Sequence, residues 1–223
     1  MEIQHLFRPS LHENRGVCPA LVLLHGMGGN KTDLMALVSK IEAQFSVLSV
    51  RAPIIMPEGG HSWYGVRFAP GPIIDSEQAE ASRLLIIEFL NHAIQRYKLE
   101  PSAVFLAGFS QGAIIAANVA LTRPDLVAGL VMMSGRVLSQ VKTQIASRAD
   151  LEHLNVFVGH GRDDQRLPLF HARETRDWLE NLGVNLTYQE YAGGHEIAAD
   201  EYRDVAQWLL ERIDRNLIRS TNL

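Results

Sequence analysis

The stretch Ala103-Val104-Phe105-Leu106-Ala107-Gly108-Phe109-Ser110-Gln111-Gly112 joins a short apolar run to a serine that stands between two glycines. The apolar run is typical of a strand buried on both faces of a sheet, so we predict a strand at Ala103–Ala107. The last five residues match G-x-S-x-G, in which the glycines let a strand turn sharply into a helix. A glycine-rich turn can match this pattern by chance, but the predicted strand before it and helix after it favour the sharp turn. Ser110 is therefore the candidate nucleophile.

Similar apolar runs alternate with helical patterns along the rest of the chain. Further strands are predicted at Ala20–Leu24, Phe45–Val50, Leu130–Met133, Asn155–Gly159 and Leu186–Tyr191. Helices are predicted at Lys31–Ala43, from Asp75 to before Pro101, from the serine to about Leu121, from Pro168 to Asn181 and around Tyr202–Ile213. This alternation predicts a single α/β domain over residues 1–223, with a mostly parallel sheet, helices on both of its faces and no large cap domain.

Composition and charge exclude several classes of protein. The formal net charge is −4, so the chain has no basic field that would hold nucleic acid or an anionic membrane. The N-terminus has no signal-peptide pattern, and the apolar runs are too short to span a bilayer. The one cysteine, Cys18, excludes an intrachain disulfide and is interpreted as a small buried hydrophobe. We therefore expect a cytoplasmic protein without stable membrane association; whether it is a monomer or a homodimer stays open.

Polar residues that suit catalysis follow several of the predicted strands. His25, Ser110, Asp164 and His195 each come just after a predicted strand, and the carboxyl ends of parallel strands meet at one edge of a sheet. A serine hydroxyl needs a general base at neutral pH. His195 follows the last strand and is the candidate base, whereas His171 falls inside a predicted helix.

The acid that would orient the base is expected just after the strand Asn155–Gly159. Asp163 and Asp164 both stand there, and their position alone barely separates them. The acid would hold the imidazole in one tautomer and stabilise its protonated form. The other aspartate would face solvent or pair with Arg162 or Arg166.

The glycine-rich stretch Leu24-His25-Gly26-Met27-Gly28-Gly29 follows the first buried strand. A backbone N–H from this loop can face a substrate carbonyl, so we expect the amides of Met27 and Gln111 to form an oxyanion hole. A phosphate-binding loop is disfavoured, because the Lys of the P-loop motif is missing. His25 is expected to be a structural hydrogen-bonding residue. No metal spacing occurs among the nine histidines, so neither a metal nor another cofactor is predicted.

A long segment, Arg51–Ile74, is rich in proline and glycine and is predicted to be an ordered loop. Long loops in compact domains tend to be functional. Trp63 and Tyr64 in this loop are interpreted as substrate-binding residues that line an acyl pocket; the alternative is that they anchor the loop by packing.

Four motifs in this order resemble those of the phospholipase/carboxylesterase family, the α/β hydrolases related to acyl-protein thioesterases. They are Leu24-His25-Gly26-Met27-Gly28, Gly108-Phe109-Ser110-Gln111-Gly112, His160-Gly161-Arg162-Asp163-Asp164 and Gly194-His195-Glu196. The segments Arg51-Ala52-Pro53 and Ser62-Trp63-Tyr64 also resemble a loop of that family. The resemblance covers about Pro19 to Leu209, and it implies the α/β-hydrolase fold.

The resemblance also implies residue roles. Ser110 would be the nucleophile and His195 the base, with the oxyanion amides at Met27 and Gln111. The family's His-Gly-x-x-Asp pattern favours Asp164 over Asp163. Two features differ from the family: Leu167 stands where its acidic turn often has Val, and the connection 135–153 looks longer and could flank the acyl pocket.

These observations predict a serine hydrolase that cleaves small-molecule carboxylic esters through an acyl-enzyme on Ser110. Some members of the family that the chain resembles cleave thioesters or lysophospholipids, and none needs a cofactor. Three alternatives use the same scaffold: a ligand-binding protein without turnover, an acyltransferase or a perhydrolase. A lipid-surface enzyme is disfavoured, because the chain has no basic amphipathic helix.

Overall fold

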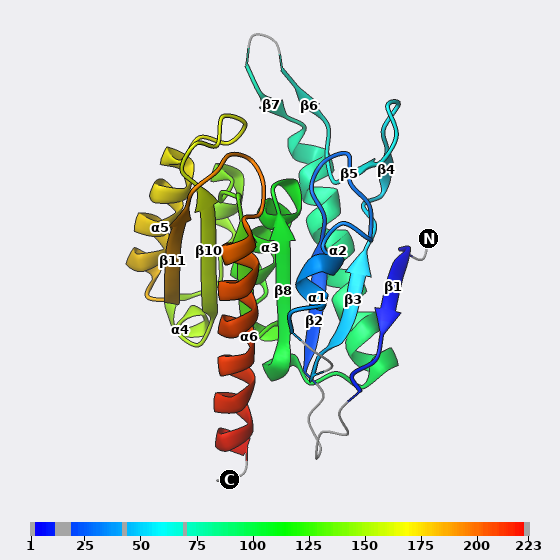
Figure 1. Cartoon of the computed structure of the whole chain (residues 1–223), viewed down its shortest axis with the longest axis vertical. Coiled ribbons are helices and arrows are strands. Elements are labelled where there is room, and N and C mark those ends of the chain that lie inside the picture. Colours follow the sequence, from blue (N-terminus) through cyan, green and yellow to red (C-terminus); the bar gives the residue numbers. More distant parts are fainter. Residues whose placement is uncertain (1–2, 12–18, 42–43, 69–70, 221–223) are drawn as a thin grey trace.

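A seven-stranded sheet runs through the molecule, and helices pack against both of its faces (Figure 1). The computed structural model describes residues 3–11, 19–41, 44–68 and 71–220, with residues 214–220 described by their backbone. The strands are β1 (His5–Arg8), β2 (Ala20–Leu24), β3 (Ser46–Val50), β4 (Ile54–Ile55), β5 (His61–Ser62), β6 (Val66–Arg67), β7 (Ile73–Ile74), β8 (Val104–Phe109), β9 (Gly129–Met133), β10 (Asn155–Gly161) and β11 (Asn185–Tyr191). The α-helices are α1 (Met35–Val38), α2 (Ser76–Tyr97), α3 (Gln111–Thr122), α4 (Arg148–Leu151), α5 (Phe170–Leu182) and α6 (Ala199–Ser220).

The order of strands in the large sheet is β1-β3-β2-β8-β9-β10-β11. Only β1 is antiparallel to its neighbour, β3; the other pairs are parallel. All residues of β2, β3 and β9 are buried. For this reason β2 and β9 read as apolar runs in the sequence, whereas β3 also buries Ser46 and Ser49. The predicted mostly parallel sheet is confirmed, and β1 supplies an antiparallel edge. Cys18 lies outside the described residues.

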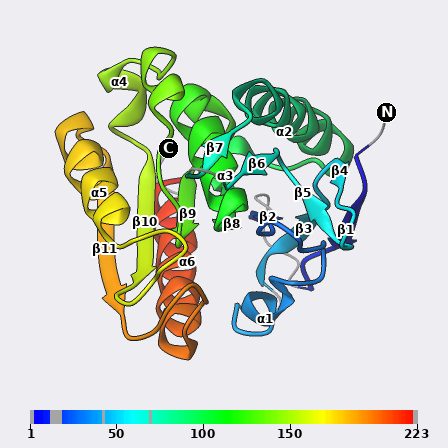
Figure 2. The ribbon, with the colours of Figure 1, turned by 90° about the horizontal axis from the view of Figure 1, so that it is seen from above.

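Two hydrophobic clusters form the core, one on each face of the sheet. Helices α2, α3, α4 and α5 cover one face, and α1 and α6 cover the other (Figure 2). On the α6 side, Val205, Leu209 and Ile213 are buried, as their helical spacing predicts. The expectation of helices on both faces is confirmed.

Two predicted segments differ from the structure. The helix expected at Lys31–Ala43 is limited to α1, because turns occupy residues 31–34. The Asp33 carboxylate accepts from the Asn30 N–H at 3.0 Å, which stabilises those turns instead of a helix. The segment Arg51–Ile74 is not a loop throughout, since it forms the two hairpins β4–β5 and β6–β7.

Local signals in the sequence explain several helix ends. Asp75 caps α2 by accepting a hydrogen bond from the Gln78 N–H at 3.0 Å. Gly183 ends α5 in the left-handed conformation, with φ at 80°. The connection 135–153 holds a 3-10 helix at Ser139–Thr143 and the short α4, so it is helical over about half of its length.

A buried carboxylate, Glu201, lies in the first turn of α6 and faces β10. Its residue is 0% exposed, and neither carboxylate oxygen makes a regular hydrogen bond among the described residues. A Cβ atom at Gly159 would overlap this carboxylate, so the glycine makes room for it. Burial raises the pKa of Glu201 to about 8, against a smaller opposing effect of the Ala198 backbone.

We predict that Glu201 makes the free energy of unfolding fall as the pH rises. Above its ordinary pKa of 4.5 the unfolded chain releases this proton, while the folded chain keeps it until about pH 8. Each pH unit in that window lowers the free energy of unfolding by about 1.4 kcal/mol. Urea unfolding of wild type and Glu201→Gln at pH 5, 6.5 and 8 should show the variant gaining relative stability at each step.

The matched control is Asp200→Asn, which removes an exposed carboxylate from the same helical turn. Its stability difference from wild type should change little across the same pH range. A stability difference between Glu201→Gln and wild type that is independent of pH would contradict the assignment.

Candidate active site

Ser110 stands between β8 and α3, in a backbone conformation that few residues adopt. Its φ is 53° and its ψ is −119°, which is strained for a residue with a side chain. The flanking glycines explain how the turn is possible. A Cβ at Gly108 would overlap the backbone of Gly112, and a Cβ at Gly112 would overlap the carbonyl of Leu24. The turn thus holds the serine at the carboxyl end of β8, as the sequence predicted.

His195 connects the serine to a buried aspartate. The His195 Nε2 atom lies 2.8 Å from the Ser110 hydroxyl oxygen, and its Nδ1 atom lies 2.7 Å from Asp164 Oδ2. In the arrangement that suits catalysis, Nδ1–H donates to the carboxylate and Nε2 accepts the serine proton. The Phe109 ring packs against the imidazole with the ring centres 5.1 Å apart. The structure therefore brings together the three predicted residues from three strand ends.

The two adjacent aspartates are clearly separated by their surroundings. The Asp164 side chain is fully buried, and its Oδ1 accepts from the backbone N–H groups of Arg166 at 2.9 Å and Leu167 at 2.8 Å. These bonds fix the carboxylate so that Oδ2 faces His195. Asp163 is exposed, and its backbone N–H donates to the carbonyl of Gly193 at 2.9 Å. Only Asp164 is placed to orient the imidazole.

A second buried histidine, His160, supports this acid, and sequence reasoning did not single it out. It is 0% exposed, and its Nε2 donates to the carbonyl of Leu167 at 2.7 Å and lies 3.3 Å from Asp164 Oδ2. Burial lowers the pKa of His160, so the ring stays neutral around neutral pH. The sequence feature that could have identified His160 is its position as the first residue of the His-Gly-x-x-Asp motif.

The two proposed oxyanion donors lie where the end of β2 approaches the start of α3. Met27 follows β2 in a turn that the neighbouring hairpin holds, because Gly28 N–H donates to the carbonyl of His61 at 2.9 Å. Gln111 is the first residue of α3, where backbone N–H groups point out of the helix. Within the described ranges, neither amide donates to another protein group. Both are therefore available to a substrate oxygen.

The side chain of Gln111 has a structural function that the sequence did not reveal. Its Oε1 accepts from Trp63 N–H at 3.0 Å and from the Ser62 hydroxyl at 3.1 Å. Its Nε2 donates to the carbonyl of Tyr64 at 2.8 Å. One amide thus fixes three consecutive residues of the hairpin region against the serine turn.

The interpretation of Trp63 and Tyr64 as pocket-lining residues is wrong for this structure. Their exposed fractions are 0% and 1%, so neither ring presents surface to a substrate. Trp63 Nε1–H donates to the carbonyl of His25 at 2.8 Å, and both rings belong to the hydrophobic core. The two rings instead anchor the loop by packing.

His25 is structural, as expected from the sequence. It is buried, its Nδ1–H donates to the carbonyl of Gly26 at 2.7 Å, and its Nε2 accepts from the Ala52 N–H at 3.1 Å.

The described residues show neither a metal-binding cluster nor a membrane-spanning helix. Among those residues, no three histidine, cysteine, aspartate or glutamate side chains lie together as metal ligands would. In the same part of the chain, no helix has the length and apolar character needed to cross a membrane.

A serine on a strained strand-to-helix turn, in a mostly parallel sheet and in contact with a histidine, defines the α/β-hydrolase class of serine hydrolases. The sequence model of the family described as "Phospholipase/Carboxylesterase" matches residues 12–213, so the chain belongs to that family. Its membership of this family and its similarity to the carboxylesterases described below show that the chain is an ester-hydrolysing enzyme.

The chain resembles several relatives and solved structures over most of its length. It is 25% identical to the "Putative hydrolase MhqD" of Bacillus subtilis, covering 95% of this chain and 100% of that protein. It is 29% identical to "Carboxylesterase SOBER1" of Arabidopsis thaliana, covering 68% of each. The crystal structure of the Bacillus cereus carboxylesterase superposes with a TM-score of 0.82 at 26% identity, covering 94% of both chains.

Separate substitutions of the two aspartates test which one orients the base. Asp164→Asn should lower kcat on an ester substrate by about 100-fold or more, because the amide stabilises the wrong imidazole tautomer. Asp163→Asn is the matched control and should stay within a few-fold of wild type, since that side chain is exposed. The larger loss at Asp163 would overturn the assignment.

Proposed function

We propose that this enzyme hydrolyses small-molecule carboxylic esters through a covalent acyl-enzyme on Ser110, with His195 as general base and Asp164 as the orienting acid. The observation that carries the proposal is the unbroken chain of contacts from the Ser110 hydroxyl through His195 to Asp164, at 2.8 and 2.7 Å. In both pairs the two atoms are close enough for proton transfer before any substrate binds.

In the first step His195 Nε2 takes the proton of Ser110, whose oxygen attacks the ester carbonyl. The negative charge that forms on the carbonyl oxygen is stabilised by the N–H groups of Met27 and Gln111 and by the N-terminus of α3. The buried Asp164 stabilises the imidazolium. When the carbon–oxygen bond to the alcohol breaks, His195 donates its proton to the leaving oxygen.

In the second step water enters where the alcohol left. His195 takes a proton from the water, and the resulting hydroxide attacks the acyl carbonyl within the same oxyanion site. Breakdown of this intermediate releases the carboxylic acid and returns the proton to Ser110. No step requires a redox or metal cofactor, since the three side chains and two amides supply every proton transfer and charge contact.

We also propose that the enzyme acts in the cytoplasm on freely diffusing esters. The single cysteine and the net charge of −4 support this location. Relatives include proteins named carboxylesterase and acyl-protein thioesterase, which supports oxygen esters and thioesters as candidate substrate classes.

A fluorophosphonate probe tests the nucleophile directly. Wild-type protein should form one covalent adduct, located on Ser110 by peptide mass spectrometry, and Ser110→Ala should form none. Ester hydrolysis should fall in the variant by about 10⁴-fold or more, to what the oxyanion site alone provides.

Folding of the variant is checked by its thermal unfolding curve, so that lost labelling is not confused with lost structure. An unlabelled but folded wild type would favour a ligand-binding protein and contradict the proposal. Product analysis in the presence of an added alcohol or hydrogen peroxide separates hydrolysis from acyl transfer and perhydrolysis.

A further inference from the structure

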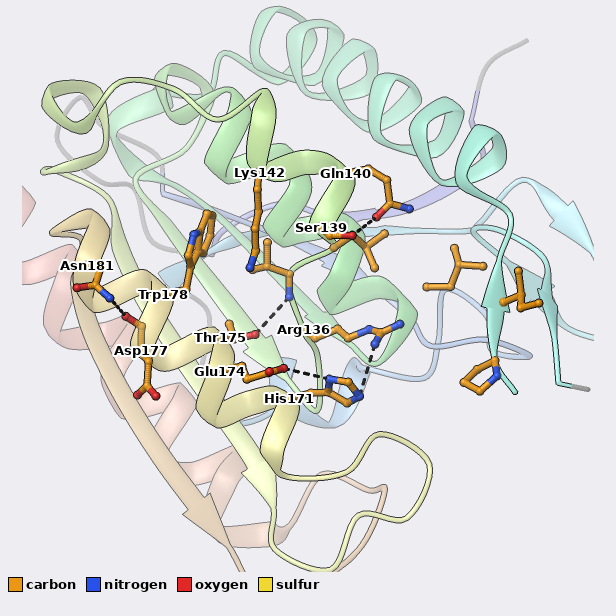
Figure 3. Close-up of a pocket in the computed structure, with 15 residues that line it drawn as sticks. Arg136, Ser139, Gln140, Lys142, His171, Glu174, Thr175, Asp177, Trp178 and Asn181 are labelled. Atoms are coloured by element: carbon orange, nitrogen blue, oxygen red, sulfur yellow. Dashed lines mark hydrogen bonds and ion pairs between the residues drawn. The ribbon is translucent and has the colours of Figure 1, made fainter. Parts of the chain in front are cut away.

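A cavity of about 770 Å³ has Arg136 and His171 among its lining residues (Figure 3). Three segments enclose it: the strand β7, the connection that follows β9, and the exposed side of α5. The Val137 N–H donates to the Thr175 hydroxyl at 3.3 Å, which ties the second segment to the third. The cavity therefore has fixed walls on two sides.

Both of these walls begin at residues that are bonded to the catalytic groups. The Ser110 N–H donates to the carbonyl of Met133 at 2.9 Å, and the connection with Arg136 starts just beyond Met133. On the other side, the Leu167 N–H donates to Asp164, and α5 begins three residues later. The walls of the cavity thus continue from the segments that hold the serine and the acid. His171 in the cavity also lies within electrostatic reach of His160, which is 3.3 Å from Asp164. This placement makes the cavity the candidate site for a substrate group that extends beyond the ester.

Arg136 contributes a cation to this cavity without an acidic partner. Its Nε atom is buried and makes no hydrogen bond, and its side chain forms no ion pair with any described carboxylate. Within the described part of the chain, its side chain makes a polar contact from Nη1 to His171 Nε2, at 3.5 Å (Figure 3). Arg136 is half-buried, and a guanidinium nitrogen shielded from water without an acceptor is stabilised when an anion completes the site.

His171 holds this arginine in place and does not neutralise it. Burial, with a further contribution from Arg136, lowers the pKa of His171, so its Nε2 keeps a lone pair for the guanidinium. On the other side of the ring, Nδ1 lies 3.6 Å from the carboxylate of Glu174, which is largely exposed. The pair of Arg136 and His171 thus leaves donors of the guanidinium fork unused.

We propose that Arg136 recognises a carboxylate on the substrate, so that the preferred esters carry a negative charge separated by a few carbon atoms from the ester group. This inference rests on the proposed ester hydrolysis at Ser110. The planar guanidinium suits a carboxylate because two parallel N–H bonds can form at once.

The rest of the cavity fits an anionic group on a short apolar chain. Ile73, Ile74, Val137 and Leu138 provide apolar surface beside Arg136. The Lys142 ammonium lies 5.1 Å from the centre of the Trp178 ring, so this second cation already has an aromatic partner. Arg136 differs from Lys142 in having a buried donor atom without an acceptor, which makes it the better candidate to bind an anion.

Two pairs of esters that differ only in a terminal carboxylate test this proposal. Monoethyl adipate is compared with ethyl hexanoate, which places the charge on the acyl part. The acetate ester of 4-hydroxybutyrate is compared with butyl acetate, which places it on the alcohol part. The ratio of kcat/KM for the charged over the neutral ester is measured by acid release at constant pH.

Wild type should prefer the charged ester in at least one pair, and the pair identifies which part of the substrate enters the cavity. Arg136→Gln should lower that ratio by about 10- to 100-fold, mainly through KM, and Arg136→Lys should restore part of it. Lys40→Gln removes one exposed positive charge outside the cavity and should leave the ratio unchanged.

Because each ratio is taken within one variant, partial loss of folded protein does not affect it. A ratio that Arg136→Gln leaves unchanged in both pairs overturns the anion site while ester hydrolysis stands. If Lys40→Gln lowers the ratio as much as Arg136→Gln does, the anion site is also overturned, because the effect is then one of net charge. If wild type and Ser110→Ala cleave the neutral esters equally poorly, the proposed hydrolysis fails.

Discussion

The close approach of the end of β2 to the start of α3 is the constraint on which the rest of the site depends. At this point the Cα of Gly112 packs directly on the carbonyl of Leu24, with no room for a side chain. The contact places Ser110 on one side and the Met27 turn on the other, so the proposed nucleophile and both proposed oxyanion amides are positioned together. Without it, a hydroxyl and two N–H groups on separate elements would have no fixed geometry.

The base and the acid depend on a second constraint, the parallel register of β10 and β11. Gly161 pairs with Tyr191, and a Cβ at Gly161 would overlap the carbonyl of Gly194. The segments that carry Asp164 and His195 therefore leave neighbouring strands side by side and at the same edge. His195 and Ser110 are 85 residues apart in the chain, and the order of strands in the sheet brings them within 2.8 Å.

Patterns that depend on burial and on strand ends were readable from the sequence, and those that depend on packing partners were not. The strand Ala20–Leu24 matches its apolar run residue for residue, because both of its faces are covered. By contrast, an aromatic pair such as Trp63 and Tyr64 can line a pocket or fill a core, and the sequence does not distinguish these. The first hairpin, with Gly59 and Gly60 at φ 95° and 75° in its turn, was missed because the whole segment was predicted to be a loop. The helical pattern of 31–43 likewise concealed the Asn30–Asp33 turn.

The same reasoning explains why Arg136 could not be identified from the sequence. An arginine after a strand is ordinarily exposed and paired, and only the packed structure reveals a buried Nε without an acceptor. In the proposed mechanism, Ser110, His195 and Asp164 act on the ester group and on one another, so they do not by themselves restrict the rest of the substrate. Selectivity must come from residues farther from the bond that breaks, on segments free to vary without moving β8 or β10. The connection after β9 is such a segment, because it is anchored at Met133 and its side chains face a cavity.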